Sequence, residues 1–267
     1  MPAHATDDPP TDALDWRYPT FRPIEYVATG IVGAGAIAVF AFGKGPTTPN
    51  WTGGILFDNA VRDAVRLRSP GARDAVRKAS DAVAFSTVLV TVGVDSLLVP
   101  LLRRSSRTAL QLLLVDAEAF AVNALVTTSS YYAIGRARPS YQDCQRDPAF
   151  DPLCNSGSTA SFWSGHTALA FTAAGLSCAH HVYLHIYGDP TADALGCAGM
   201  ITLGTATATL RVLGDRHYAT DVLTGAVVGF GFGYGVPTLL HYAAGPMRAM
   251  AVTPSREGLG LALSGTF

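Results

Sequence analysis

The 267-residue chain carries little charge, and few of its cationic side chains are lysines. Only 15% of its residues are Asp, Glu, Lys or Arg, whereas a typical soluble domain has about 25%. Lys44 and Lys78 are the only lysines. The formal net charge of -1 gives no reason to expect nucleic acid as a partner.

The N-terminal region lacks the basic and then apolar pattern of a signal peptide. It is acidic and rich in proline, which predicts a disordered tail over residues 1–23. Residues 24–245 are predicted to form a single domain, followed by a C-terminal tail over residues 246–267. Within that tail, Leu259–Phe267 alternates apolar and small residues as a strand would.

Apolar sequence is abundant, because 49% of the residues are hydrophobic. A helix that crosses a bilayer needs about 20 predominantly apolar residues. Six stretches approach this length: Tyr26–Phe42, Ala82–Leu102, Ala109–Ile134, His166–Tyr187, Ala194–Leu210 and Ala219–Tyr242. The sequence therefore predicts an all-α, multi-pass membrane protein with a bundle of about six transmembrane helices.

Six spans place both chain ends on one side and the loops after spans one, three and five on the other. The short loop with Arg103, Arg104 and Arg107 is strongly positive, which predicts a cytoplasmic location. The loops after spans one, three and five would then face the periplasm or exterior, if the protein lies in a bacterial inner membrane. Against this, the loop over residues 43–81 is itself rich in arginine, which argues for the opposite orientation.

The loop after span one also contains an amphipathic pattern. Leu56–Ser80 places apolar residues on one helical stripe, and Ser69-Pro70-Gly71 interrupts it. The pattern predicts one or two short helices that lie in the membrane interface.

Two pairs of cysteines differ in their surroundings. Cys144 and Cys154 flank a polar stretch, where either a disulfide of an oxidising compartment or two free thiols are consistent with the sequence. Cys178 and Cys197 fall within predicted spans, so we expect them to be small buried apolar residues.

Three short segments at predicted helix ends carry side chains that suit phosphate-ester chemistry. A phosphate monoester carries roughly -1.5 to -2 charges near neutral pH, so its site needs fixed cations and a neutral nucleophile. All three segments lie in the loops after spans three and five, on one membrane face. They are Arg136-Ala137-Arg138-Pro139, Ser164-Gly165-His166 and Arg211–Asp221, the last of which reads R-x5-H-x3-D.

Each segment supplies a distinct part of such a site. Arg138 and Arg211 offer planar donor forks for phosphoryl oxygens, and Arg136 or Arg216 could add charge. Ser164-Gly165-His166 begins a predicted helix, whose N-terminus presents free N–H groups. The pattern therefore predicts a phosphate site that requires no metal ion and no cofactor.

The reacting groups are the two histidines and one acid. Neutral His217 is the candidate nucleophile, which would form a phosphohistidine that water later hydrolyses. Asp221, four residues on, would share its helical face and hold its other ring nitrogen. His166 would donate a proton to the leaving oxygen.

At these residues the chain resembles the PAP2 (type 2 phosphatidic acid phosphatase) superfamily, whose signature is K-x6-R-P, P-S-G-H and S-R-x5-H-x3-D. The resemblance covers about Tyr131 to Gly225, and six membrane helices fit the lipid-phosphatase branch. It implies metal-independent hydrolysis of lipid phosphates or diphosphates through a phosphohistidine. It also implies a nucleophile, an acid, a partner of the nucleophile and a set of phosphate-binding residues: His217, His166, Asp221, and Arg138, Ser164, Gly165 and Arg211.

Three positions depart from the signature. Its lysine falls on Tyr131, its proline on Trp163 and the serine of its third part on Leu210. Tyr131 remains a candidate phosphate-binding residue, but its hydroxyl offers one neutral hydrogen bond in place of a charge-assisted one. We therefore expect weaker substrate binding, for which Arg136 could compensate.

Several functions remain open at this stage. The resemblance favours a membrane phosphatase acting on phosphatidate, phosphatidylglycerol phosphate or polyprenyl diphosphate, with membrane lipids as its other partners. A lipid phosphotransferase and the haloperoxidase branch are enzymatic alternatives, and the latter is disfavoured because those enzymes look soluble. Tyr131 keeps a non-catalytic lipid-binding or transport protein open. So do the intramembrane acids Asp95, Asp116 and Glu118, which are either an ion path or hydrogen-bonded side chains.

Overall fold

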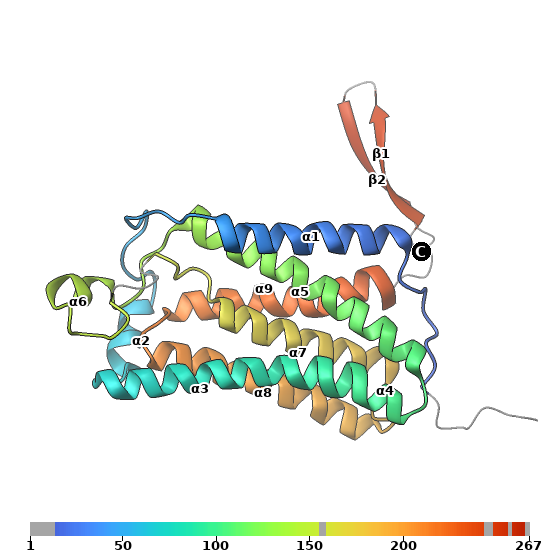
Figure 1. Ribbon diagram of the computed structural model, residues 1–267, viewed down its shortest axis with the longest axis horizontal. Helices are drawn as coiled ribbons and strands as arrows, with labels where there is room; N and C mark the ends of the chain where they lie inside the picture. The colour runs from blue at the N-terminus through green and yellow to red at the C-terminus, as the bar shows by residue number, and fades with distance from the viewer. Residues whose placement is uncertain (1–13, 155–158, 243–247, 256–257, 265–267) are drawn as a thin grey trace, which may run out of the picture.

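The computed structural model describes residues 14–154, 159–242, 248–255 and 258–264, and Figure 1 shows the helices running side by side. Apart from one antiparallel hairpin, the described elements are helical, which confirms the predicted all-α membrane fold. The elements are α1 (Pro23–Phe42), α2 (Asp58–Val65), α3 (Pro70–Val88), η1 (Leu89–Leu98), α4 (Val99–Leu102), α5 (Ser106–Ile134), α6 (Tyr141–Arg146), α7 (Gly165–Leu184), α8 (Pro190–Leu213), α9 (Ala219–Pro237), η2 (Thr238–Tyr242), β1 (Arg248–Ser255) and β2 (Gly258–Ser264).

All six stretches predicted as spans are helical. Among the described residues, four helical stretches are long and apolar enough to cross a membrane: Pro23–Phe42, Pro70–Leu102, Ser106–Ile134 and Ala219–Tyr242. The second of these is α3, η1 and α4 joined end to end. The remaining two predicted spans are α7 and α8, and α7 is the most enclosed helix of the bundle, flanked by α3, α5, α8 and α9.

Of the short helices predicted over Leu56–Ser80, the structure contains only the first. α2 is short, but from Pro70 onward the chain already belongs to the long helix that crosses the bundle. Ser69 is the N-cap of α3, where its side chain accepts a hydrogen bond from the Ala72 N–H at 3.1 Å, and Pro70 occupies the first helical turn. Ser69-Pro70-Gly71 therefore starts a helix, whereas the sequence suggested an interruption.

The chain ends also differ from the predicted tails. Leu14, Trp16 and Phe21 are buried in a core cluster, so residues 14–22 pack on the bundle. Of the predicted N-terminal tail, residues 1–13 lie outside the described part. At the other end, β1 and β2 form the hairpin that projects from the bundle in Figure 1.

Three glycines spaced four apart bring α9 against α7. A Cβ at Gly225, Gly229 or Gly233 would overlap backbone atoms of α7, so only glycine permits this approach. The contact aligns the N-terminal ends of the two helices, where the Ser164 N–H donates to the Asp221 carbonyl at 3.1 Å. Two of the three chemical segments therefore meet because of glycine spacing in α9.

The intramembrane acids have hydrogen-bonding partners on other helices. This agrees with the second of the two interpretations, hydrogen-bonded side chains that face the bundle interior. The pairs are Asp95 with Ser177 (2.7 Å) and Tyr187 (2.8 Å), Asp116 with His180 (2.8 Å), and Glu118 with His241 (2.8 Å).

All four cysteines are in disulfides. Cys144 is bonded to Cys154 in the loop between α5 and α7, which is one of the two alternatives left open by the sequence. The expectation of unpaired thiols at Cys178 and Cys197 is wrong, because these residues join α7 to α8 with a Cα–Cα distance of 4.5 Å.

Candidate active site

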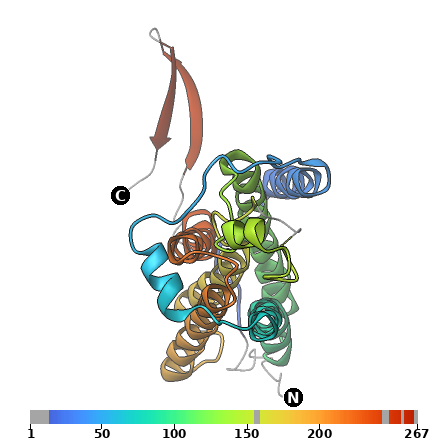
Figure 2. The ribbon, with the colours of Figure 1, turned by 90° about the vertical axis from the view of Figure 1, so that its left-hand side faces the viewer.

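The three chemical segments converge at one end of the bundle. This end contains the C-terminal ends of α5 and α8 and the N-terminal ends of α7 and α9. It lies to the left in Figure 1 and faces the viewer in Figure 2, with α6 in front.

His217 is held as a neutral ring with one nitrogen available. Its Nδ1 lies 2.7 Å from the carbonyl oxygen of Ser161, and a carbonyl can only accept, so Nδ1 carries the proton. The Nε2 lone pair then faces the Arg138 guanidinium, with Nη1 at 3.2 Å. Arg138 Nη1 also donates to the Arg216 carbonyl at 2.8 Å. This arrangement presents Nε2 of His217 beside the cation of Arg138, which the sequence predicts to bind phosphate.

Asp221 and His217 approach each other, but the predicted hydrogen bond between them is absent. Asp221 Oδ2 lies 3.7 Å from His217 Nδ1, beyond hydrogen-bond range, because α9 begins only at Ala219 and the two residues do not share a helical face. Asp221 instead accepts from the Ser161 hydroxyl at 2.6 Å and from the Tyr218 N–H at 2.9 Å. Ser161 therefore links the acid to the histidine, and no sequence signal marked this serine.

Arg136 does not reach the phosphate site. It is fully buried and pairs with Asp221 and with Asp58 of α2, the latter at 2.7 Å. Its guanidinium lies 4.0 Å from the ring centroid of Trp51 and 4.3 Å from that of Tyr218. The expectation that Arg136 compensates for the missing lysine is therefore wrong, because its charge is already neutralised.

Tyr131 projects from α5 onto the start of α7. A Cβ at Gly165 would overlap the Tyr131 hydroxyl, so glycine is required here by this neighbour. Ser164 is buried and caps α7, where its hydroxyl accepts from the Thr167 N–H at 3.4 Å. Tyr131, which stands where the family signature has a lysine, therefore places its hydroxyl against the first turn of α7.

Arg211 and His166 share a partner that the sequence reasoning missed. Asp81 of α3 contacts Arg211 Nη2, and the same carboxylate oxygen lies 3.2 Å from His166 Nε2. Burial and the charge of Arg211 lower the pKa of His166 to about 4, although the Asp81 carboxylate opposes this shift. The one feature of the sequence that could have indicated a role for Asp81 is its position directly before the predicted span that begins at Ala82.

Arginines dominate the electrostatics of the site. Burial and then the charges of Arg138, Arg77 and Arg211 together lower the pKa of Arg216 to about 9. Burial and the charges of Arg138, Arg211 and Arg216 hold the pKa of His217 well below its ordinary value of 6.5. Arg216 has no salt bridge within the described part of the chain. The site therefore places a neutral histidine among several arginines, one of which, Arg211, is paired with Asp81.

Other arginines fix the loop that covers this end. Burial raises the pKa of Asp151, but hydrogen bonds from Arg77, the Leu153 N–H and Arg73 outweigh it and bring the pKa to about 2. Arg62 and Arg66 of the α2 region hold the α6 loop in the same way through Asp143, at 2.7 and 2.9 Å. Much of the positive charge between residues 43 and 81 is therefore taken up in ion pairs across the loops.

An apolar cavity leads to the candidate acid. It has a volume of about 520 Å³ and lies between α1, α3, α5 and α7. Tyr131, Gly165 and His166 form its polar end, and the remainder is largely apolar, with Phe40, Phe85, Val88, Phe120 and Leu169.

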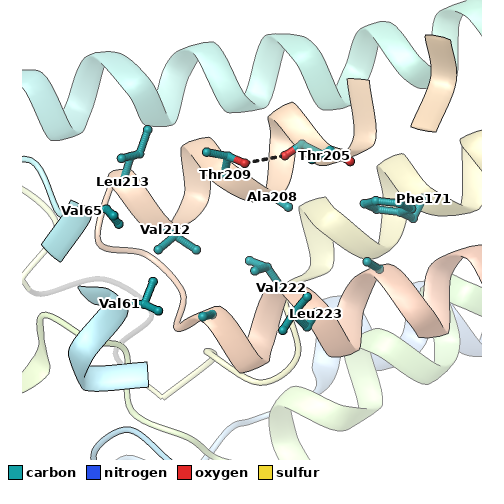
Figure 3. Close-up of a pocket in the computed structure, with 12 residues that line it drawn as sticks. Val61, Val65, Phe171, Thr205, Ala208, Thr209, Val212, Leu213, Val222 and Leu223 are labelled. Atoms are coloured by element: carbon teal, nitrogen blue, oxygen red, sulfur yellow. Dashed lines mark hydrogen bonds between the residues drawn. The ribbon is translucent and has the colours of Figure 1, made fainter. Parts of the chain in front are cut away.

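A second cavity, of about 410 Å³, lies between α2, α8 and α9 and is drawn in Figure 3. Val61 and Val65 line it from α2 and Phe171 from α7, while the hydroxyls of Thr205 and Thr209 are bonded to carbonyls within α8. No titratable side chain lines it, whereas His166 and Tyr131 line the first cavity. Among the described residues, no three His, Cys, Asp or Glu side chains gather as a metal site would require.

A family model described as the PAP2 superfamily matches residues 112–244. The match includes α5 from Leu112 onward and the whole of α7, α8 and α9. No curated protein matches the chain, and no solved structure matches it.

Proposed function

Because the chain belongs to the PAP2 superfamily, we propose that it is an integral-membrane phosphatase that hydrolyses lipid phosphates or diphosphates. The family supports phosphatase chemistry in general. The observation that carries the lipid assignment is the apolar cavity that ends at His166 and Gly165, since a hydrocarbon chain there would bring its phosphate to the arginines.

The first step is transfer of the phosphoryl group to His217. The Nε2 lone pair forms a bond to phosphorus while the bond from phosphorus to the lipid oxygen breaks. Arg138 and Arg211 bind the non-bridging oxygens, and the N–H groups at the start of α7 add dipolar stabilisation. His166, protonated when the dianionic substrate is bound beside it, donates its proton to the leaving oxygen.

The second step is hydrolysis of the phosphohistidine. His166 now accepts a proton from water as the water oxygen bonds to phosphorus and the P–N bond breaks. The ring returns to its neutral form, with Nδ1–H donating to the Ser161 carbonyl throughout. Asp221 acts through Ser161 and stabilises this orientation of the ring.

The proposed location is a bacterial inner membrane with the site facing the exterior. The loop that covers the site holds the Cys144–Cys154 disulfide, which suits an oxidising compartment. The opposite end carries the positive loop with Arg103, Arg104 and Arg107.

Phosphate release from a substrate panel tests this function. Purified protein in detergent and EDTA should release phosphate from at least one of phosphatidate, phosphatidylglycerol phosphate and polyprenyl diphosphate. A water-soluble ester with the same head group but short chains should have a kcat/KM at least about tenfold lower, because it buries less apolar surface in the cavity. Equal kcat/KM values would contradict the lipid assignment, and no release from any substrate would favour a non-catalytic lipid-binding protein.

Arg216→Gln should move the acid limb of the kcat/KM profile to higher pH. The Arg216 charge helps to hold the pKa of His217 low, so its removal raises that pKa and protonates the nucleophile at a pH where the wild type is still neutral. We expect a shift of about half to one pH unit, read from kcat/KM because that ratio reports the free enzyme. Arg146→Gln removes an exposed charge from α6 at the same end and should leave the limb in place. Identical profiles for both variants would contradict the expected role of Arg216.

A further inference from the structure

One carboxylate oxygen connects the candidate acid to the phosphate-binding arginine. Oδ1 of Asp81 contacts Arg211 Nη2 and lies 3.2 Å from His166 Nε2. The three residues come from α3, α8 and α7, so three helices meet at this oxygen. We propose that Asp81 is a positioning residue that holds Arg211 and His166 against the same carboxylate oxygen and supplies the counter-charge for protonated His166.

The counter-charge is needed because cations surround His166. The charges of Arg211, Arg138 and Arg216 act on the imidazole from α8 and from the two loops beside it. Each of them disfavours the protonated ring, yet only the protonated ring can donate to a leaving oxygen. Asp81 is the acid whose carboxylate oxygen lies 3.2 Å from the ring, and its charge opposes them.

The spacing also matches the substrate. The oxygen bound by Arg211 and the oxygen protonated by His166 are attached to the same phosphorus, so the two side chains must stay close together. Asp81 fixes this separation before substrate arrives. Its negative charge also competes with phosphate for Arg211, so Asp81 should weaken phosphate binding while it supports proton donation. Opposite effects on binding and turnover are the signature of this role.

The test is Asp81→Asn, with Asp74→Asn as the matched control. Both acids lie on α3 with similar side-chain exposure, 46% and 37%, but Asp74 pairs with Lys78 away from the site. For Asp81→Asn we expect kcat about tenfold lower and the basic limb of the kcat profile about one pH unit lower, because His166 loses its proton more readily. Inorganic phosphate, measured through its effect on the unfolding temperature, should bind roughly two- to fivefold more tightly. Asp81→Glu keeps the charge and should restore most of kcat.

The inference rests on the proposed function, but the two can fail separately. If the wild type releases no phosphate from any lipid while Asp81→Asn still binds inorganic phosphate more tightly, the phosphatase assignment fails and the placement of Asp81 beside the anion site stands. If the wild type is active and Asp81→Asn matches Asp74→Asn in kcat, basic limb and phosphate affinity, the role of Asp81 is overturned. Weaker phosphate binding by Asp81→Asn would also overturn it, because Asp81 would then help to build the anion site.

Discussion

His217→Ala is expected to lower phosphate release from the best lipid substrate by about 10⁴-fold or more. The reason is that Nε2 of His217 is the only group placed to form the covalent intermediate in the proposed mechanism. Arg138, Arg211 and the start of α7 remain in the variant, so substrate should still bind. A rapid quench with radiolabelled lipid phosphate should trap label on the wild-type protein and none on the variant.

His185→Ala is the matched control for this experiment. His185 lies at the opposite end of α7, and its side chain is 57% exposed, so its loss removes a histidine without touching the site. Its activity should equal that of the wild type. Release by His217→Ala within tenfold of the wild-type rate would show that another group or a direct attack by water performs the reaction.

Arg136→Met is expected to cause the largest loss of stability. Asp58 and Asp221 are both fully buried and both pair with Arg136, so removal of the guanidinium leaves two carboxylates without their cation. Breaking a buried pair from one side costs about 3–5 kcal/mol. We expect the unfolding temperature in detergent to fall by roughly 10 °C.

Lys78→Met serves as the comparison, because Lys78 forms an exposed pair with Asp74 four residues earlier on α3. Exposed pairs of this kind contribute little, so no measurable change in unfolding temperature is expected. If the two variants unfold at the same temperature, Arg136 does not organise the site end of the bundle. A stable but inactive Arg136→Met variant would indicate that Arg136 acts on the substrate and not on the fold.

The arginines around the site differ in whether they have ion-pair partners. The signature lysine is absent, and Arg136 is committed to Asp58 and Asp221. Arg216 directly precedes the nucleophile and has no salt bridge within the described residues, so it is free to serve an anion. A cation without an ion-pair partner costs stability, which a bound anion would restore.

The properties that depend on residues close together in the chain can be predicted from the sequence. The lengths of the apolar stretches predicted six helices, and all six are present, because a membrane helix must satisfy its backbone hydrogen bonds within its own segment. The order and spacing of the three chemical segments identified the family and grouped Arg138, His166, Arg211 and His217 at one end. The spacing of the glycines in α9 is also a local property of the sequence, and these glycines face α7.

The hydrogen-bond partners of the polar side chains, in contrast, depend on how the helices pack. The i, i+4 spacing of His217 and Asp221 suggested a direct bond, but the helix begins after His217, and a carbonyl from residue 161 lies nearer to the ring. Arg136 looked available, yet it faces two acids that the chain supplies 78 and 85 residues away. Asp81 belongs to no motif and reaches His166 only because α3 packs beside α7. A hydrogen bond needs its two atoms within about 3 Å, and for residues far apart in the chain that distance is set by helix packing, which local sequence does not encode.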